Sequence, residues 1–281
     1  MAGASINDIK ARIKSVGSTM QITRAMELVA TSKLRRAKEK AENTRPFLKQ
    51  LKVCLDGIVS SDAIDGSVYT AKREGKTLYV VVGGDRGLAG GYNSNVFKLT
   101  EALAKNEEHE VLPIGKKAND YYAHRNADVL SSKHLYVSEI SVGNALEIAD
   151  LVCAEFLEGK YDSIVLVYTK FVSMISQLPV YEQLLPLDRT TDKKENKADP
   201  IYAGEPEEIL DKIVPQYVGG VIYSAVCEAL AAESAARRTA MNAANKNASE
   251  IIDTLVLKYN RARQAVITQE ITEIVSGSEA L

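Results

Sequence analysis

Two long heptad patterns, one at each end of this 281-residue chain, constrain its fold more than any other feature. In the N-terminal segment, from about Ser5 to Ile58, apolar or small residues recur at steps of three and four. They are Ile6, Ile9, Ile13, Val16 and Met20, followed by Leu34, Ala37, Ala41, Thr44, Leu48, Leu51, Leu55 and Ile58. Such spacing is typical of a helix in a coiled coil.

The heptad register of the first run, Ile6 to Met20, does not continue through apolar residues into the second run, which begins at Leu34. A continuous heptad register would place Thr23 and Glu27 at the seam, whereas the apolar residues Ile22, Met26 and Val29 lie one place earlier. We therefore expect the apolar stripe to rotate around the helix here, so that the helix turns another face towards a different neighbour.

The C-terminal pattern runs from about Glu207 to Ser276, without proline after Pro215. At about 1.5 Å per residue, the uninterrupted helix would span roughly 90 Å. Its predicted seam comprises Ile222, Ala225, Ala229, Ala232, Ala236, Thr239 and Ala243, and then, shifted by one residue, Ala244, Ala248, Ile251 and Leu255. Since a compact segment separates the two seams, we expect the helices to pair antiparallel, with a left-handed supercoil.

The middle of the chain alternates between strand-like and helical runs. The expected strands are Thr77–Val82, Glu110–Ile114, Ser163–Phe171 and Leu178–Leu185, and the expected helices are Ser94–Lys105, Lys116–Arg125 and Val142–Leu157. This order predicts an α/β fold, a Rossmann-like domain with a largely parallel sheet inserted into a long antiparallel coiled coil. The predicted domains are residues 1–60, 61–206 (with a mobile charged loop near 187–200) and 207–281.

Composition excludes several classes of function. The formal net charge of −2 gives no support to nucleic-acid binding. Cys54, Cys153 and Cys227 are far apart and form no CxxC, which is typical of a reducing compartment. The longest apolar runs, such as that from Ile164, are shorter than the roughly 18 residues that a membrane span needs. The three histidines form no metal-binding motif, and no nucleophile motif is present.

The glycine-rich stretch "GGDRGLAGGYN", Gly83 to Asn93, follows a predicted strand and precedes a predicted helix. That context is typical of phosphate-binding loops, but the spacing matches neither GxxxxGK[ST] nor GxGxxG. A tight strand-to-helix crossover is favoured, and a loop that contacts a partner is a third reading. The phosphate reading keeps an alternative function open, a nucleotide-binding α/β enzyme with a coiled-coil dimerisation arm.

Two other surfaces point to partners. The basic stretch from Ser32, "SKLRRAKEK", is either a solvated helix face or a positive surface for an acidic partner. Near the C-terminus, Ile267, Ile271, Ile274 and Val275 extend beyond the reach of the shorter N-terminal helix. An uncovered apolar helix end predicts a binding partner.

Three segments closely resemble the γ subunit of the F-type ATP synthase. They are "MQITRAMELVATSKLRRA" from Met20, "GGDRGLAGGYN" from Gly83, and "YNRARQAVITQEITEIVSGSEAL" from Tyr259. The resemblance covers both ends of the chain and the order of the elements between them.

The resemblance implies a central rotor shaft that couples ion-driven rotation of the membrane c-ring to ATP synthesis or hydrolysis in the β subunits. The implied partners are three α and three β subunits, the ε subunit and the c-ring. Implied contacts with the αβ ring are Met26, Arg35, Arg36, Arg237, Arg263, Gln264, Thr268 and Glu270. Tyr202 is the implied contact with the c-ring and ε.

The resemblance further implies that this chain is not catalytic and binds no cofactor, because Mg-ATP and Mg-ADP would bind to α and β. The chain lacks the paired-cysteine insertion of chloroplast relatives and a separate transit segment. We therefore expect a bacterial protein, peripheral on the cytoplasmic side of the inner membrane, whose membrane association is indirect through the c-ring.

Overall fold

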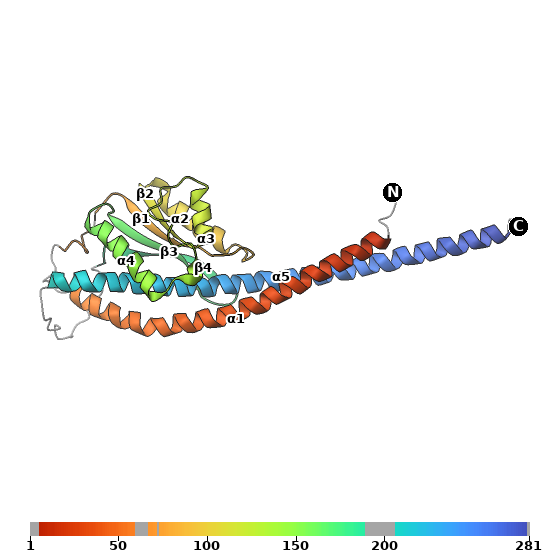
Figure 1. Cartoon of the computed structure of the whole chain (residues 1–281), viewed down its shortest axis with the longest axis horizontal. Coiled ribbons are helices and arrows are strands. Elements are labelled where there is room, and N and C mark those ends of the chain that lie inside the picture. Colours follow the sequence, from red (N-terminus) through yellow and green to blue (C-terminus); the bar gives the residue numbers. More distant parts are fainter. Residues whose placement is uncertain (1–5, 60–66, 72, 189–205, 280–281) are drawn as a thin grey trace. The chain divides into compact units, whose positions relative to one another are not determined.

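The computed structural model describes residues 6–59, 67–71, 73–188 and 206–279. The chain forms two compact units, one made of Met1–Ala30 with Arg238–Leu281 and the other of Thr31–Arg237. Helices α1 (Ile6–Val59) and α5 (Pro206–Glu279) contribute to both units (Figure 1). The predicted domain boundaries at residues 60 and 206 coincide with the ends of the long helices and differ from the boundaries of the compact units. The predicted domains stay a prediction.

A four-stranded sheet forms the centre of the unit Thr31–Arg237. Its strands are β1 (Thr77–Val82), β2 (His109–Ile114), β3 (Ser163–Phe171) and β4 (Gln177–Leu185), in the order β2-β1-β3-β4. β1 pairs in parallel with β2 and β3, and β4 pairs antiparallel with β3. The expected largely parallel α/β sheet is confirmed.

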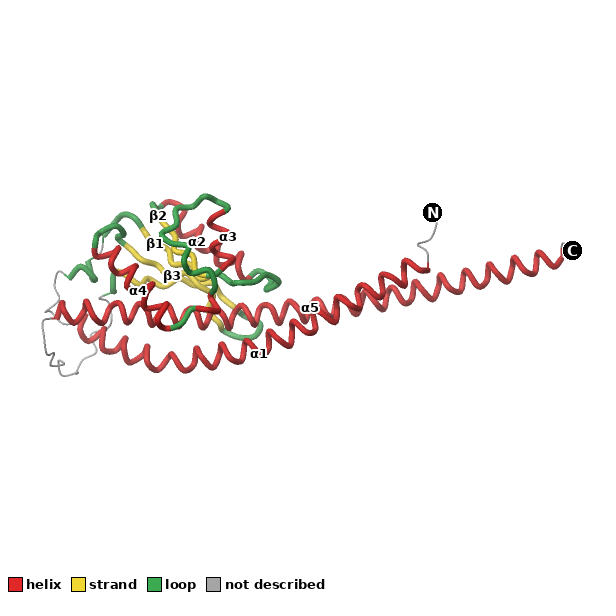
Figure 2. Tube along the Cα trace, in the orientation of Figure 1, coloured by secondary structure: helices red, strands yellow, loops and turns green. Residues whose placement is uncertain are grey.

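Each face of the sheet has its own helices (Figure 2). On one face, side chains of α2 (Tyr92–Leu103) and α3 (Lys116–Ala123) pack against Tyr79 and Val81 of β1. On the other, α4 (Val142–Leu157) and α5 pack against the alternate residues of that strand. Because side chains alternate across a strand, the fully buried run TLYVVV supplies both layers.

Within this unit, α1 and α5 pair along small and apolar side chains. Leu34 and Ala37 of α1 cluster with Ala231 and Ala235 of α5. Arg45 forms an ion pair with Glu228 at 3.1 Å. A Cβ atom added at Gly220 would lie 2.5 Å from a methyl carbon of Leu48. Higher residue numbers on α1 therefore meet lower numbers on α5, which confirms antiparallel pairing here.

In the unit Met1–Ala30 with Arg238–Leu281, the same helices pair through a polar layer. Asn245 donates its side-chain amide to Glu27 Oε2 (2.9 Å), and Asn242 donates to Glu27 Oε1 (3.1 Å). Thr23 donates its hydroxyl to Asn245 Oδ1. The face of α1 that pairs with α5 thus keeps Thr23 and Glu27, because asparagine side chains from α5 satisfy both polar groups at the seam. The apolar stripe leaves this face, and its contact with a different neighbour stays a prediction.

The apolar residues of this stretch of α1 lie on its outer side. Ile22 and Val29 are 62% and 56% exposed, whereas Ala30 is buried. On α5 the predicted seam residues Ala248 and Leu255 are buried, but the prediction is wrong at Thr239, Ala243 and Ile251, which are exposed. The inward residues instead repeat at alternating steps of four and three, as Met241, Asn245, Ala248, Ile252 and Leu255.

Helix α5 contains a longer apolar stretch than the short apolar runs noted in the sequence. By length and composition alone, α5 could cross a membrane, because an 18-residue window reaches a mean hydropathy of 1.3. However, 61% of that window is buried inside the protein. Alanine raises the hydropathy of this helix where it packs against α1 and the sheet.

Candidate functional site

The glycine-rich loop between β1 and α2 is held by hydrogen bonds from neighbouring segments. Asp85 accepts from the backbone N–H of Val137 (2.7 Å) and from the N–H and hydroxyl of Ser138 (3.1 and 2.7 Å). The N–H of Gly83 donates to Ile114 O, and that of Gly84 donates to Asn93 Oδ1. These two N–H groups, which a phosphate-binding loop would offer to an anion, already have acceptors within the chain.

Two of the loop's glycines are explained by close packing. A Cβ atom at Gly83 would lie 2.9 Å from Ala118 Cβ, and one at Gly84 would lie 3.0 Å from the carboxyl carbon of Glu233. Leu88 and Gly90 both have positive φ angles, of 60° and 58°. The geometry supports a tight strand-to-helix crossover in which glycine permits close approach.

Arg237 of α5 closes this loop from the other side. Its Nε donates to Gly87 O, and its Nη2 donates to Arg86 O and Gly87 O, each at 3.2 Å. The same guanidinium forms an ion pair with Glu233, and the two side chains are only 11% and 7% exposed. Sequence reasoning placed Arg237 at a ring contact, which stays a prediction, and it missed both Glu233 and this internal set of acceptors.

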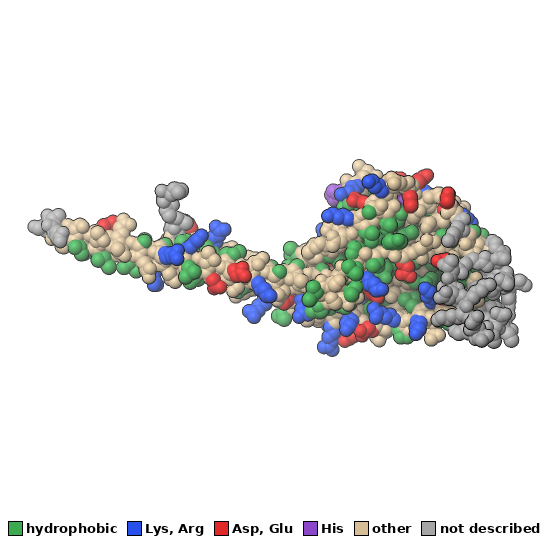
Figure 3. Space-filling view, turned by 180° about the vertical axis from the view of Figure 1, so that it is seen from behind, with side chains coloured by type: hydrophobic (Ala, Val, Ile, Leu, Met, Phe, Trp, Pro, Cys, Tyr) green, Lys and Arg blue, Asp and Glu red, His purple; other side chains and the backbone are tan. Residues whose placement is uncertain are grey.

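The basic stretch of α1 is on the surface of the unit Thr31–Arg237. Arg35 pairs with Glu39 at 3.2 Å, with side chains 84% and 59% exposed, and Arg36 is also exposed. Figure 3 shows Lys and Arg side chains mixed with Asp and Glu along the helices. Exposed pairs of this kind contribute at most about 1 kcal/mol to stability, so these arginines are available to a partner.

The C-terminal part of α5 is exposed on all sides from Arg263 to Ser278. The predicted contact residues Arg263, Gln264, Thr268 and Glu270 lie here, beside Ile267, Ile271 and Ile274, which are 45%, 56% and 71% exposed. The expectation of an uncovered apolar helix end is confirmed for the chain by itself.

The other predicted contact residues differ in their surroundings. Met26 is half-buried on α1, in the stretch that carries the polar layer. Tyr202 lies outside the described residues, as does most of the predicted loop at 187–200. Sequence reasoning did not predict the hydrogen-bonded layer of Thr23, Glu27, Asn242 and Asn245. A continuous heptad register nevertheless places Thr23 and Glu27 inward, which was the available signal.

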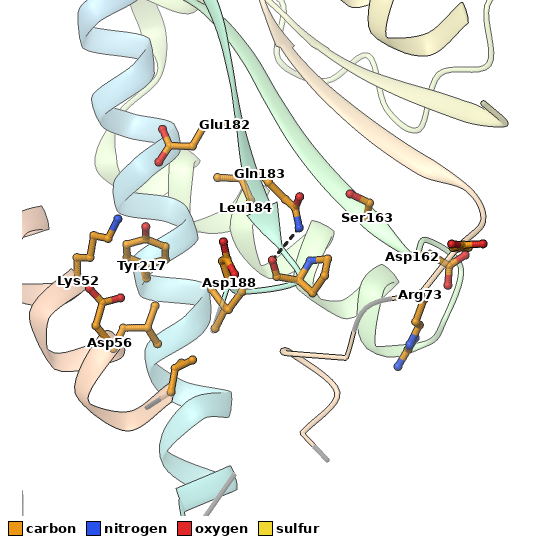
Figure 4. A pocket seen from close by; sticks show the side chains of 15 residues that line it. Lys52, Asp56, Arg73, Asp162, Ser163, Glu182, Gln183, Leu184, Asp188 and Tyr217 are labelled. Atoms are coloured by element: carbon orange, nitrogen blue, oxygen red, sulfur yellow. Dashed lines mark hydrogen bonds between the residues drawn. The ribbon is translucent and has the colours of Figure 1, made fainter. Parts of the chain in front are cut away.

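A cavity of about 630 Å³ lies beside β4 in the unit Thr31–Arg237. Lys52 and Asp56 of α1 line it, together with Tyr217 of α5 and Glu182 of β4 (Figure 4). Burial raises the pKa of Asp56 and of Glu182, and in both cases the charge of Lys52 opposes that rise. Burial also raises the pKa of Tyr217 to about 12.

The chemistry of this cavity is mixed. Acidic and basic side chains share its wall, and Gln183 donates its side-chain amide to Pro186 O at 3.0 Å. No group of three or more His, Cys, Asp or Glu residues able to hold a metal ion occurs within the described ranges. The cavity therefore offers neither a uniform charge for a phosphate nor a ligand set for a cation.

Comparison with known proteins decides the family. The family model described as ATP synthase matches residues 5–281. The chain belongs to the ATP synthase γ chain family. It is 45% identical to the ATP synthase gamma chain of Ruminococcus albus, with 98% of each chain covered. It is 42% identical to the sodium-ion-specific gamma chain of Acetobacterium woodii, with 99% of each covered.

Solved structures share the fold. A rotor structure of the Euglena gracilis mitochondrial ATP synthase matches with a TM-score of 0.64 at 18% identity, covering 95% of this chain and all of that one. The central stalk and c-ring structure from Tetrahymena thermophila matches with a TM-score of 0.62 at 24% identity, covering 79% of this chain and 99% of that one. These likenesses agree with the predicted α/β fold with long terminal helices.

Proposed function

We propose that this chain is the central rotor shaft of a bacterial F-type ATP synthase. The exposed apolar end of α5 carries the proposal, because Ile267, Ile271, Ile274 and Val275 are 45–71% exposed in the chain alone. A helix face of this kind needs a surrounding partner. We infer that this partner is the ring of three α and three β subunits, and family membership supports that inference.

In this role the chain performs no bond chemistry. Mg-ATP and Mg-ADP bind to the α and β subunits, while the chain offers a different surface to each β subunit as it turns. A ligand or partner shifts a conformational equilibrium only by its differential affinity for the two states. The asymmetric shaft therefore favours a different β conformation at each orientation, which couples rotation to nucleotide affinity.

Several predicted contacts suit this role by their exposure. Arg35 and Arg36 suit acidic loops on β, and the C-terminal contacts suit the sleeve around the shaft. These C-terminal contacts are Arg263, Gln264, Thr268 and Glu270. Met26 joins them from α1, and Tyr202 is proposed to contact ε and the c-ring. The chain is held on the cytoplasmic side of the inner membrane indirectly, through the c-ring.

Native mass spectrometry of the chain co-expressed with α and β from the same genome tests the proposal. We expect one copy with three α and three β, in a complex that hydrolyses ATP. Deleting residues 267–281 should weaken assembly or coupling, whereas deleting only 277–281 is the matched control. A chain that stays apart from folded α and β would overturn the proposal.

A further inference from the structure

Three residues on one face of α5 contact the sheet domain, two of them through hydrogen bonds. They are Ala229, Glu233 and Arg237, spaced by four residues, and that spacing aligns them along the helix. Tyr92 donates its hydroxyl to the carbonyl of Ala229 at 3.2 Å. Glu233 packs against Gly84, and Arg237 donates to the carbonyls of Arg86 and Gly87. The face thus reaches both the glycine loop and the start of α2.

The surroundings of this face are otherwise small and apolar. Ala232 and Ala236 cluster with Ala89, Tyr92 and Phe171. Apolar contact is non-directional, so alanine surfaces by themselves resist sliding or twisting weakly. Hydrogen bonds from a guanidinium are directional and strengthened by its charge. The polar contacts therefore determine where the loop sits on the helix.

The loop also contains a strained backbone conformation, which contacts with neighbouring residues must maintain. Leu88 has a φ angle of 60° although it is not glycine, and its side chain is 63% exposed. Such a conformation persists only where the surrounding structure imposes it. Asp85 fixes one end of this segment through Val137 and Ser138, and Arg237 fixes the other through Gly87.

We propose that Glu233 and Arg237 form an internal clamp that fixes the loop 84–89 to α5, so that the sheet domain and the C-terminal helix turn as one body. Arg237 is then a positioning residue instead of a ring contact. The proposal rests on the rotor function for its consequence, torque transfer, but its geometry is independent of that function. Glu233 orients the guanidinium, and the guanidinium holds two successive carbonyls of the loop.

Hydrogen exchange in the full chain tests the geometry, and coupling in the assembled complex tests the consequence. In Arg237→Gln we expect exchange at residues 85–89 to rise by about tenfold or more, because charge-assisted hydrogen bonds to the loop are lost. In the complex, ion pumping per ATP hydrolysed should fall while ATP hydrolysis continues. Arg237→Lys should be intermediate, because an ammonium lacks the planar fork. Lys98→Gln, an exposed charge change on α2, is the control.

A second substitution separates the clamp from general unfolding. Leu88→Gly removes the conformational strain, so the double variant Leu88→Gly/Arg237→Gln should regain part of the protection at 85–89. A merely damaged core would not respond to this change. Unchanged exchange in Arg237→Gln would overturn the clamp, as would equal loss of coupling in Lys98→Gln. If the complex fails to assemble even with the unmodified chain, the rotor function fails, while exchange in the free chain still decides the clamp.

Discussion

The helices α1 and α5 pair in both units, and the two stretches achieve their pairing by different means. In Thr31–Arg237 the seam is closed by alanine, with Ala231 and Ala235 buried against Leu34 and Ala37 of α1 and a sheet domain packed on the same helix. In the other unit, the buried residues among those described are Ala30, Met241, Ala248 and Leu255. That two-helix stretch instead carries a layer of hydrogen bonds through Glu27 and Asn245.

The difference shows how one helix pair can serve two purposes. A stretch backed by a sheet gains stability from buried apolar area, at roughly 25 cal/mol per Å². A bare pair of helices buries less, so its stability is smaller and its register needs another determinant. Polar residues at the seam of a coiled coil fix register at a cost in stability. We therefore expect one stretch to be sensitive to side-chain volume and the other to hydrogen bonding.

The largest effect should come from overfilling the alanine seam. Ala231→Leu places an isobutyl group at a seam site that is only 1% exposed, against Leu34 and Ala37, and we expect a loss of about 3 kcal/mol in the free energy of unfolding. Ala243→Leu is the matched control on the same helix, because Ala243 is exposed in the other unit. Chemical denaturation of the full chain measures both, and equal losses would contradict the difference between the two stretches.

A smaller effect is expected from the polar layer. Asn245→Ala leaves Glu27 without one of its two amide donors, and we expect a loss of about 1–2 kcal/mol. The triple change Thr23→Val, Glu27→Leu and Asn245→Leu should instead preserve or raise stability, because the remaining donor, Asn242, is exposed and can bond to water.

The triple variant should pair less uniquely. A slip of one heptad would move a distance along the helix by about 10 Å. Spin labels at exposed Lys14 and Glu250, with exposed Cys54 replaced by Ser, report this distance by pulsed electron paramagnetic resonance. We expect one narrow distribution with the native layer and a broad or shifted one without it. A narrow, unshifted distribution in the triple variant would contradict the register role.

How far the sequence predicts this structure depends on the kind of signal. β1, β3 and α4 match their predicted bounds, because continuous apolar runs and a capping serine at Ser141 mark them clearly. Beyond Arg238 the predicted seam of α5 was right at Ala248 and Leu255 but wrong at Thr239, Ala243 and Ile251, because alanine is frequent on several faces of this helix. Periodicity of apolar residues cannot locate a seam that contains Asn245.

The candidate site was less predictable than the fold. The arginines and the apolar C-terminal end are visible in the sequence as surface features. The internal partners of Arg237 are about 150 residues away along the chain, at Arg86 and Gly87, so no local pattern indicates them. The cavity at β4 likewise combines α1, β4 and α5, which only the tertiary structure brings together.

A pH dependence should distinguish the two stretches further. Burial raises the pKa of Glu182 above its ordinary value of 4.5, Lys52 and Lys170 oppose that rise, and Glu228 adds to it. The folded state therefore binds this proton more tightly than the unfolded state. Its stabilising contribution is complete below the unfolded value and is lost as pH rises through the folded pKa.

Replacing Glu182 tests that dependence. Glu182→Gln should raise the denaturation midpoint at pH 7 and flatten the pH profile above 4.5. Glu74→Gln, at an exposed carboxylate of the same cavity, is the control. Hydrogen exchange resolved by residue should confine the change to Thr31–Arg237. A lower midpoint for Glu182→Gln at pH 7 would show that the carboxylate is stabilised in the fold.

Substitutions on the outer face of α1 should have the smallest effect on stability. They should nevertheless lower the assembly of the complex clearly. Ile22→Gln and Val29→Gln change side chains that are 62% and 56% exposed, so the free energy of unfolding should change by less than about 0.5 kcal/mol. Met20→Gln is the matched change at the half-buried seam, and it should weaken the helix pair. If the outer face serves the αβ ring, the first two variants should lower the yield of assembled complex despite their normal stability. If only Met20→Gln lowers the yield of complex, the recognition surface lies elsewhere. Ile22 and Val29 would then contribute neither to helix pairing nor to partner binding.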